Sequence, residues 1–116
     1  MNQIYYHDYD TDYPYFEMWQ RLMKEYLAKT DTFELHIWNE ETEMIDFALK
    51  YGIIKNDPWQ YGKIITGKVT EEFIEMIIST AEENHDGIFH KMTPFFGIFL
   101  DDIFESAHYG TEIYYK

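Results

Sequence analysis

Histidines and paired acids are the residues of this sequence best suited to metal or acid–base chemistry, and their spacing matches no known site. His7 and His85 each precede an aspartate, while His90 and His108 stand apart from both. His85 and His90 are five residues apart, a spacing that places them on different sides of a helix. The sequence contains neither HExxH nor any cysteine, so the usual zinc patterns are missing. We therefore predict no metal site and no cofactor.

Nucleophilic and phosphate-binding motifs are also missing from the sequence. Its serines are Ser79 and Ser106, and neither lies in a G-x-S-x-G sequence. The six glycines are scattered singly, so no Walker or dinucleotide-binding loop can be drawn. Adjacent aspartates such as Asp101 and Asp102 are usually solvated rather than poised for proton transfer. We predict no catalytic residues and a protein that is not an enzyme.

The most unusual stretch runs from Ile4 to Glu17, where tyrosines alternate with aspartates and no lysine or arginine intervenes. Tyrosine combines a large apolar ring with a polar hydroxyl, and it supplies contact area at low entropic cost. Unpaired carboxylates between such rings suit a basic partner. We expect contact through Tyr6 to Tyr13 above all.

The charge of the chain is strongly acidic and unevenly distributed. The formal net charge is -13, from -4 over residues 1–17, -1 over 18–68 and -8 over 69–116. Phosphate contacts need lysine or arginine to displace counterions, so direct binding of nucleic acid is not expected. A plainer interpretation is that the acids keep an aromatic-rich protein in solution.

Length and composition predict one folded domain over residues 1–116 without a linker. Hydrophobic residues make up 46% of the 116 and aromatic residues 20%, far above a disordered composition. The chain lacks cysteine, an opening signal-peptide pattern and an 18-residue apolar run. We therefore expect a soluble cytoplasmic protein without membrane contact.

Periodicity predicts interleaved helices and strands. The predicted strands are 4–9, 32–38, 63–69, 88–92 and 111–115, and the predicted helices are 14–29, 39–52, 70–84 and 93–108. Asn39 and Thr70 are the expected N-caps of the second and third helices. The run FFGIFL also permits a buried strand that turns at Asp101-Asp102 instead of the fourth helix. The predicted fold is a compact α+β domain with about four helices on a small, mostly antiparallel sheet.

These surfaces predict a protein-binding inhibitor of the immunity or antitoxin type, which neutralises a basic partner such as a nuclease toxin. Carboxylates would take the places of phosphates and aromatic rings the places of stacked bases. The predicted partner-binding residues are Tyr6, Asp8, Tyr9, Asp10, Asp12, Tyr13, Asp101, Asp102 and Glu105.

Two other functional classes fit the same sequence. Met44, Phe47 and Tyr51 form a second apolar stripe on the predicted helix 39–52, through which a structural or regulatory module would associate into a homodimer. Alternatively, Trp38, Trp59 and Tyr61 would line an aromatic pocket for a small ligand or substrate.

Overall fold

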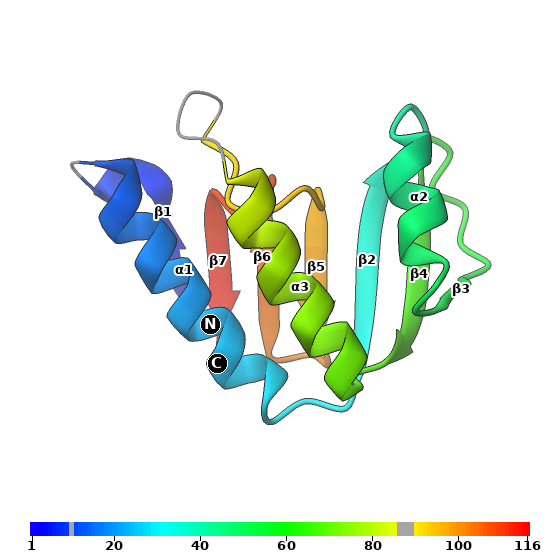
Figure 1. Cartoon of the computed structure of the whole chain (residues 1–116), viewed down its shortest axis with the longest axis horizontal. Coiled ribbons are helices and arrows are strands. Elements are labelled where there is room, and N and C mark those ends of the chain that lie inside the picture. The colour runs from blue at the N-terminus through cyan, green and yellow to red at the C-terminus, as the bar shows by residue number, and fades with distance from the viewer. Residues whose placement is uncertain (10, 86–89) are drawn as a thin grey trace.

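The part of the chain that the structure describes forms one seven-stranded antiparallel sheet in the order β1-β7-β6-β5-β2-β4-β3 (Figure 1). The computed structural model describes residues 1–9, 11–85 and 90–116. The strands are β1 (Asn2–Tyr5), β2 (Thr32–Trp38), β3 (Ile53–Ile54), β4 (Gly62–Lys68), β5 (Gly97–Leu100), β6 (Phe104–Ala107) and β7 (Glu112–Tyr115). The strand β2 lies near the middle of the sheet, between β4 and β5.

Three α-helices lie along one side of this sheet, and the other side carries none among the described residues (Figure 1). They are α1 (Asp12–Leu27), α2 (Thr42–Ala48) and α3 (Glu71–Asn84), and a short 3-10 helix, η1 (Tyr6–Asp8), follows β1. The protein is therefore an α+β domain, as predicted, but it has three α-helices in the described residues rather than about four.

The core fills the space between the helices and one face of the sheet. Phe33 of β2 stacks on Phe73 of α3 with ring centroids 3.8 Å apart. The buried Trp19 indole of α1 donates a hydrogen bond to the Ser106 hydroxyl of β6 at 3.0 Å. Because these contacts join residues far apart in the sequence, they fix both helices over the central strands.

The longer two helices and strand β2 follow their sequence patterns closely. The predicted strand 32–38 matches β2, and its inward side chains Phe33, Leu35 and Ile37 are all buried. The Thr70 hydroxyl accepts a hydrogen bond from the Phe73 amide, so Thr70 is the N-cap of α3, as predicted. Helix α1 begins at Asp12, two residues before the predicted start at Pro14.

The predicted helix 93–108 is wrong, and its alternative is correct. This segment forms β5 and β6, joined by a turn at Asp101–Asp102. Asp101 has a left-handed backbone with φ of 48°, which a hairpin turn tolerates and a helix does not. The apolar run is buried on the helix-covered face through Ile98 and Leu100, while Phe99 projects from the opposite face.

The second helix, α2, is shorter than the predicted helix 39–52. Asn39 is not an N-cap, because its side-chain amide donates to the Gln60 carbonyl and so ties the end of β2 to the loop before β4. Helix α2 consequently starts only at Thr42. The two-residue strand β3, which the sequence pattern did not indicate, then follows at the sheet edge.

The ends of the chain pair with each other. Strand β1 covers Asn2–Tyr5 rather than the predicted 4–9, and it pairs with β7, which matches the predicted strand 111–115. The predicted strand 88–92 lies partly outside the described residues, and its described part, 90–92, belongs to no strand of the sheet.

Candidate partner-binding face

Side chains that project from the sheet away from the helices form a surface that we call the open sheet face. Successive side chains of a strand alternate between its two faces. Eight outward side chains are aromatic or acidic and half-buried, and they are Tyr5, Glu34, His36, Trp38, Phe99, Glu105, Glu112 and Tyr114. The same face also carries Gln3, Thr32, Ile64, Thr66, Lys68 and Ala107. A sheet face of this composition, with no helix over it in the described residues, is the principal candidate site.

One row across this face alternates acids with aromatic rings. The strand register pairs Glu34 of β2 with Phe99 of β5, Phe99 with Glu105 of β6, and Glu105 with Tyr114 of β7. Directly paired residues of neighbouring strands have side chains in contact range. Phe99 therefore lies between two carboxylates, with Tyr114 beyond the second one.

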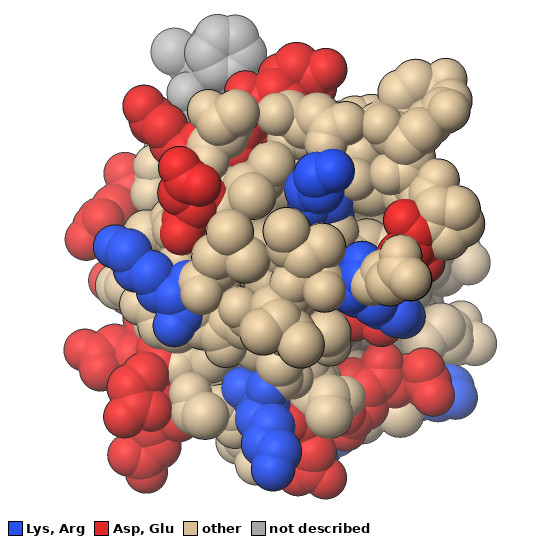
Figure 2. Space-filling view, turned by 90° about the vertical axis from the view of Figure 1, so that its right-hand side faces the viewer, with Lys and Arg blue, Asp and Glu red and all other residues tan. Residues whose placement is uncertain are grey.

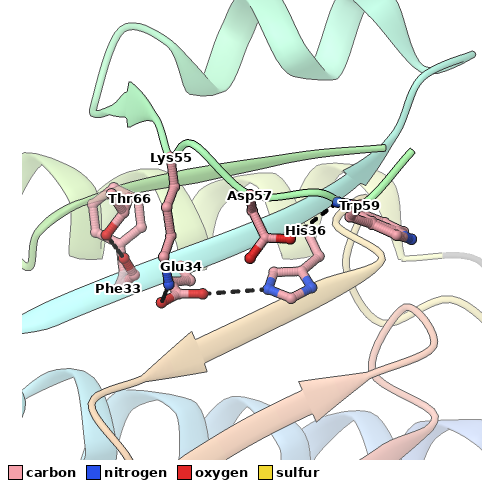
Figure 3. Close-up of polar contacts among 7 residues, drawn as sticks. All are labelled: Phe33, Glu34, His36, Lys55, Asp57, Trp59 and Thr66. Carbon is pink, nitrogen blue, oxygen red and sulfur yellow. Dashed lines mark hydrogen bonds and ion pairs between the residues drawn. The ribbon is translucent and has the colours of Figure 1, made fainter. Parts of the chain in front are cut away.

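Glu34 already holds a cation within this row. The Lys55 ammonium donates to one Glu34 oxygen at 3.0 Å, and His36 Nε2 lies 3.5 Å from the other oxygen (Figure 3). Burial opposes the charged form of Glu34, but the hydrogen bonds from Lys55 and His36 outweigh it, so the pKa of Glu34 is lowered. The carboxylate is thus ionised and shared by two donors.

His36 lies in an aromatic setting beside this ion pair. Its ring centroid is 4.3 Å from that of Phe99 and 5.6 Å from that of Trp59. Burial lowers the pKa of His36 more than the neighbouring Glu34 raises it. The imidazole therefore acts near neutral pH mainly as an uncharged ring of the open sheet face.

The other half of the face is acidic without a lysine or arginine partner among the described residues. Burial, followed by the like charge of Glu112, raises the pKa of Glu105. Glu112 forms a close contact with His108 and accepts from the Tyr114 hydroxyl. A side-chain hydrogen bond with Tyr5, then burial and the charge of Glu112, raise the pKa of Tyr114 to about 12. Negative charge is therefore crowded in this half.

The aromatic residues predicted to line a pocket lie in two different settings. Trp38 and Trp59 contact each other with ring centroids 5.3 Å apart, and the Trp59 ring covers Gly62, whose place admits no side chain. Within this loop the Asp57 carboxylate accepts a hydrogen bond from the Trp59 amide (Figure 3). Tyr61 is 60% exposed and makes no ring contact with either tryptophan in the described residues.

A groove of about 550 Å³ adjoins Phe99 and Glu34 on the open sheet face. Its remaining lining comes from Asp31, Thr32, Phe33, Thr66, Asp101 and Asp102. Two of the predicted binding residues, Asp101 and Asp102, therefore lie at a concave part of the surface. Asp101 is already engaged there, because its carboxylate accepts from the Thr32 amide at 2.9 Å and the Thr32 hydroxyl at 2.8 Å.

The predicted binding segment Tyr6 to Tyr13 lies elsewhere and is partly structural. The rings of Tyr6 and Tyr9 each pack edge-on against buried Tyr15, at 5.3 Å. The Asp12 carboxylate contacts His85, whereas Tyr13 is 65% exposed. Asp8 is exposed, and Asp10 lies outside the described residues.

The described residues of the two predicted binding regions are separated along the strands. At one end of the strands, Tyr5 at the start of the N-terminal region pairs with Glu112. At the other end, Asn2 pairs with Tyr115. Tyr115 also pairs with Phe104, which lies near Asp101 and Asp102. The regions thus lie at opposite ends of the strands (Figure 1). Of the eight predicted residues that the structure describes, only Glu105 belongs to a strand and projects from the open sheet face, while Asp101 and Asp102 lie at the groove beside it.

Sequence reasoning missed most of this face, although one signal pointed to it. The strand 32–38 has Glu34, His36 and Trp38 on its polar side, and a tryptophan there is unusual for a solvated face. The contributions of Phe99 and Tyr114 depend on which strands pair, so no local pattern could assign them to the same surface.

Cationic side chains gather at one edge of the molecule. Lys50, Lys55, Lys63 and Lys68 all belong to the segment from the end of α2 to the end of β4. Figure 2 shows this edge, where lysines lie among acidic and uncharged residues. The exposed Ile53 and Ile54 of β3 belong to the same edge. This edge therefore carries lysines, whereas the acidic half of the open sheet face has no lysine or arginine partner among the described residues.

Comparison with known proteins assigns no family to this chain. No protein-family model, curated protein or solved structure matches it. None of the helices in the described residues has the length and apolar character needed to cross a membrane.

Proposed function

We propose that this protein is an acidic inhibitor of the immunity or antitoxin type, which binds and neutralises a basic partner such as a nuclease toxin. The observation that carries the proposal is the open sheet face, where half-buried aromatic rings alternate with carboxylates. Aromatic rings supply much of the energy of protein interfaces, and carboxylates complement a basic surface.

The charge of the whole chain supports the same proposal. At a net charge of -13, long-range attraction would speed the encounter with a cationic protein and would weaken as salt is added. In a nuclease cleft, carboxylates would occupy the positions of phosphates and aromatic rings those of bases.

Capture of the partner from the native source tests this proposal. A basic protein should be retained at low salt and released at high salt, and after identification by mass spectrometry the purified partner should bind directly and lose its activity at equimolar ratio. Recovery of this protein alone, as a stable dimer, would instead favour the self-associating module.

Two double variants locate the interface. Glu105→Gln with Tyr114→Ala changes the open sheet face, and Asp8→Asn with Tyr13→Ala changes exposed residues of the predicted N-terminal segment. We expect the first to weaken binding more than about tenfold, as hot-spot residues do, and the second to change it little. The opposite ranking would place the interface on Tyr6 to Tyr13.

The self-associating alternative retains one supporting observation. Met44, Phe47 and Tyr51 are half-buried and pack against the core, so the predicted second apolar stripe of this helix mostly makes contacts within the chain. The β3 edge instead exposes Ile53 to 71% and Ile54 to 50%. An exposed apolar edge strand can pair with another chain.

A further inference from the structure

We propose that Phe99, with Glu34 and Glu105 on its two sides, receives an arginine side chain of the basic partner. This inference rests on the proposed function, because it names the chemical group that the partner would present to the open sheet face.

The register gives this row the shape of a guanidinium site. Glu34 and Glu105 both pair with Phe99, from β2 and β6 on either side of β5. Neighbouring strands are about 4.8 Å apart, so the two backbones are separated by roughly 10 Å across the Phe99 ring. A planar guanidinium can stack on an aromatic face and donate to carboxylates on two sides, whereas an ammonium is a compact point charge.

The ion pair at Glu34 shows that this row binds a cation within the chain. Lys55 reaches over from the loop after β3 and contacts Glu34 at 3.0 Å, beside Phe99. Glu105, the equivalent residue on the other side of Phe99, has no hydrogen bond or ion pair from its side chain in the described parts of the chain. A cation from a partner would pair with Glu105 as Lys55 pairs with Glu34.

Space for such a side chain adjoins the row. The groove of about 550 Å³ is lined by Phe99, Glu34 and Asp102, among others. Phe99 is only half-buried, so its ring is accessible from solvent. An arginine stem can therefore lie in the groove while its guanidinium stacks on the face of the Phe99 ring that His36 does not occupy.

Titration with an octa-arginine peptide at low salt tests the site directly. We expect NMR signals of the Phe99 ring and the Glu105 carboxyl carbon to shift together. Glu105→Gln should weaken peptide binding by about fivefold, because the guanidinium loses one carboxylate partner but keeps its cation–π contact with the Phe99 ring. Glu75→Gln on the exposed surface of α3 makes the same charge change and should have little effect.

A gain of binding provides a second, independent test. Lys55→Met frees Glu34 from its internal cation and should strengthen binding of the peptide by about threefold. Lys63→Met is the matched control, because Lys63 is exposed on β4, is paired with inward-facing Ile37, and lies away from the open sheet face.

The outcomes separate this site from the proposed function. Unmoved Phe99 and Glu105 signals, or equal effects of Glu105→Gln and Glu75→Gln, would overturn the site even if a basic partner is captured. Equal responses to octa-lysine and octa-arginine would overturn the assignment of arginine. If octa-arginine binds at Phe99 and Glu105 but no basic partner is captured, the arginine site is supported and the proposed function is refuted.

Discussion

At the scale of single residues, Asp101 shows how a carboxylate can look free in the sequence and be engaged in the fold. Its positive φ of 48° turns the chain between β5 and β6, and its oxygens accept from the amides of Asp31 and Thr32. Hydrogen bonds from Thr32, side chain first and then backbone, lower the pKa of Asp101 against a smaller opposing effect of burial. Its first role is therefore to fasten the β5–β6 turn to the start of β2.

Asp101→Asn gives a pH-dependent prediction at this scale. Because the folded pKa lies below the ordinary value of 3.8, the ionised group contributes stability above the unfolded pKa and loses it as pH falls through the folded pKa. At pH 6 the variant should be less stable than the wild type by about 1 kcal/mol. The difference should shrink below pH 3.8, as measured by urea unfolding at several pH values.

Asp102→Asn is the control for this prediction. Asp102 is the exposed neighbour, and its side chain makes no hydrogen bond in the described residues. Its stability difference from the wild type should stay small over the same range. A pH-independent effect of Asp101→Asn would show that the turn depends on shape rather than on the charge of Asp101.

At the scale of elements, the two long helices start in different ways. Helix α3 has a side-chain cap, since the Thr70 hydroxyl accepts from the Phe73 amide at 3.1 Å. Helix α1 follows Thr11, whose side chain makes no capping hydrogen bond. The N-terminus of α1 therefore depends on packing of its buried face, which includes Tyr15 and Trp19.

This difference makes the two threonines a matched pair. Thr70→Ala should lower the free energy of unfolding by about 1 kcal/mol, because it leaves an amide at the start of α3 without its partner. Thr11→Ala should change it by less than about 0.5 kcal/mol. Chemical denaturation of both variants measures the two values, and equal losses would contradict a capping role for Thr70.

In the whole molecule, a sheet with helices on one side only is combined with a high net negative charge. All three α-helices in the described residues cover one side of the sheet, so the other side is open to a partner or to solvent wherever Trp59 does not cover it. A net charge of -13 makes the acidic groups of the folded chain repel one another.

Salt should therefore stabilise this protein. Raising NaCl from 10 mM to about 0.5 M screens repulsion among the acids, and a gain of about 1 kcal/mol corresponds to a rise in Tm of about 5 °C for a chain of this size. Calorimetry at both salt concentrations checks the change. A fall in Tm would mean that attractive pairs such as Lys55 with Glu34 outweigh the repulsion.

Elements with a local sequence pattern could be predicted without the structure. The strand 32–38 alternates apolar and polar residues, helix α3 has an apolar stripe behind its Thr70 cap, and both patterns need only neighbouring residues to be recognised. The same local information identified an acidic, tyrosine-rich N-terminal segment. It could not indicate that Tyr6 and Tyr9 pack on Tyr15.

The conformation of segment 93–108 and the composition of the open sheet face depend on contacts between distant parts of the chain. The run FFGIFL is apolar at almost every position, so helix and strand were both consistent with it, and pairing of β5 with β2 selected the strand. Glu34, Phe99 and Glu105 are adjacent because strands distant in sequence pair in one register. Register depends on burial of the opposite face and on hydrogen bonds between strands, which no single stretch of sequence contains.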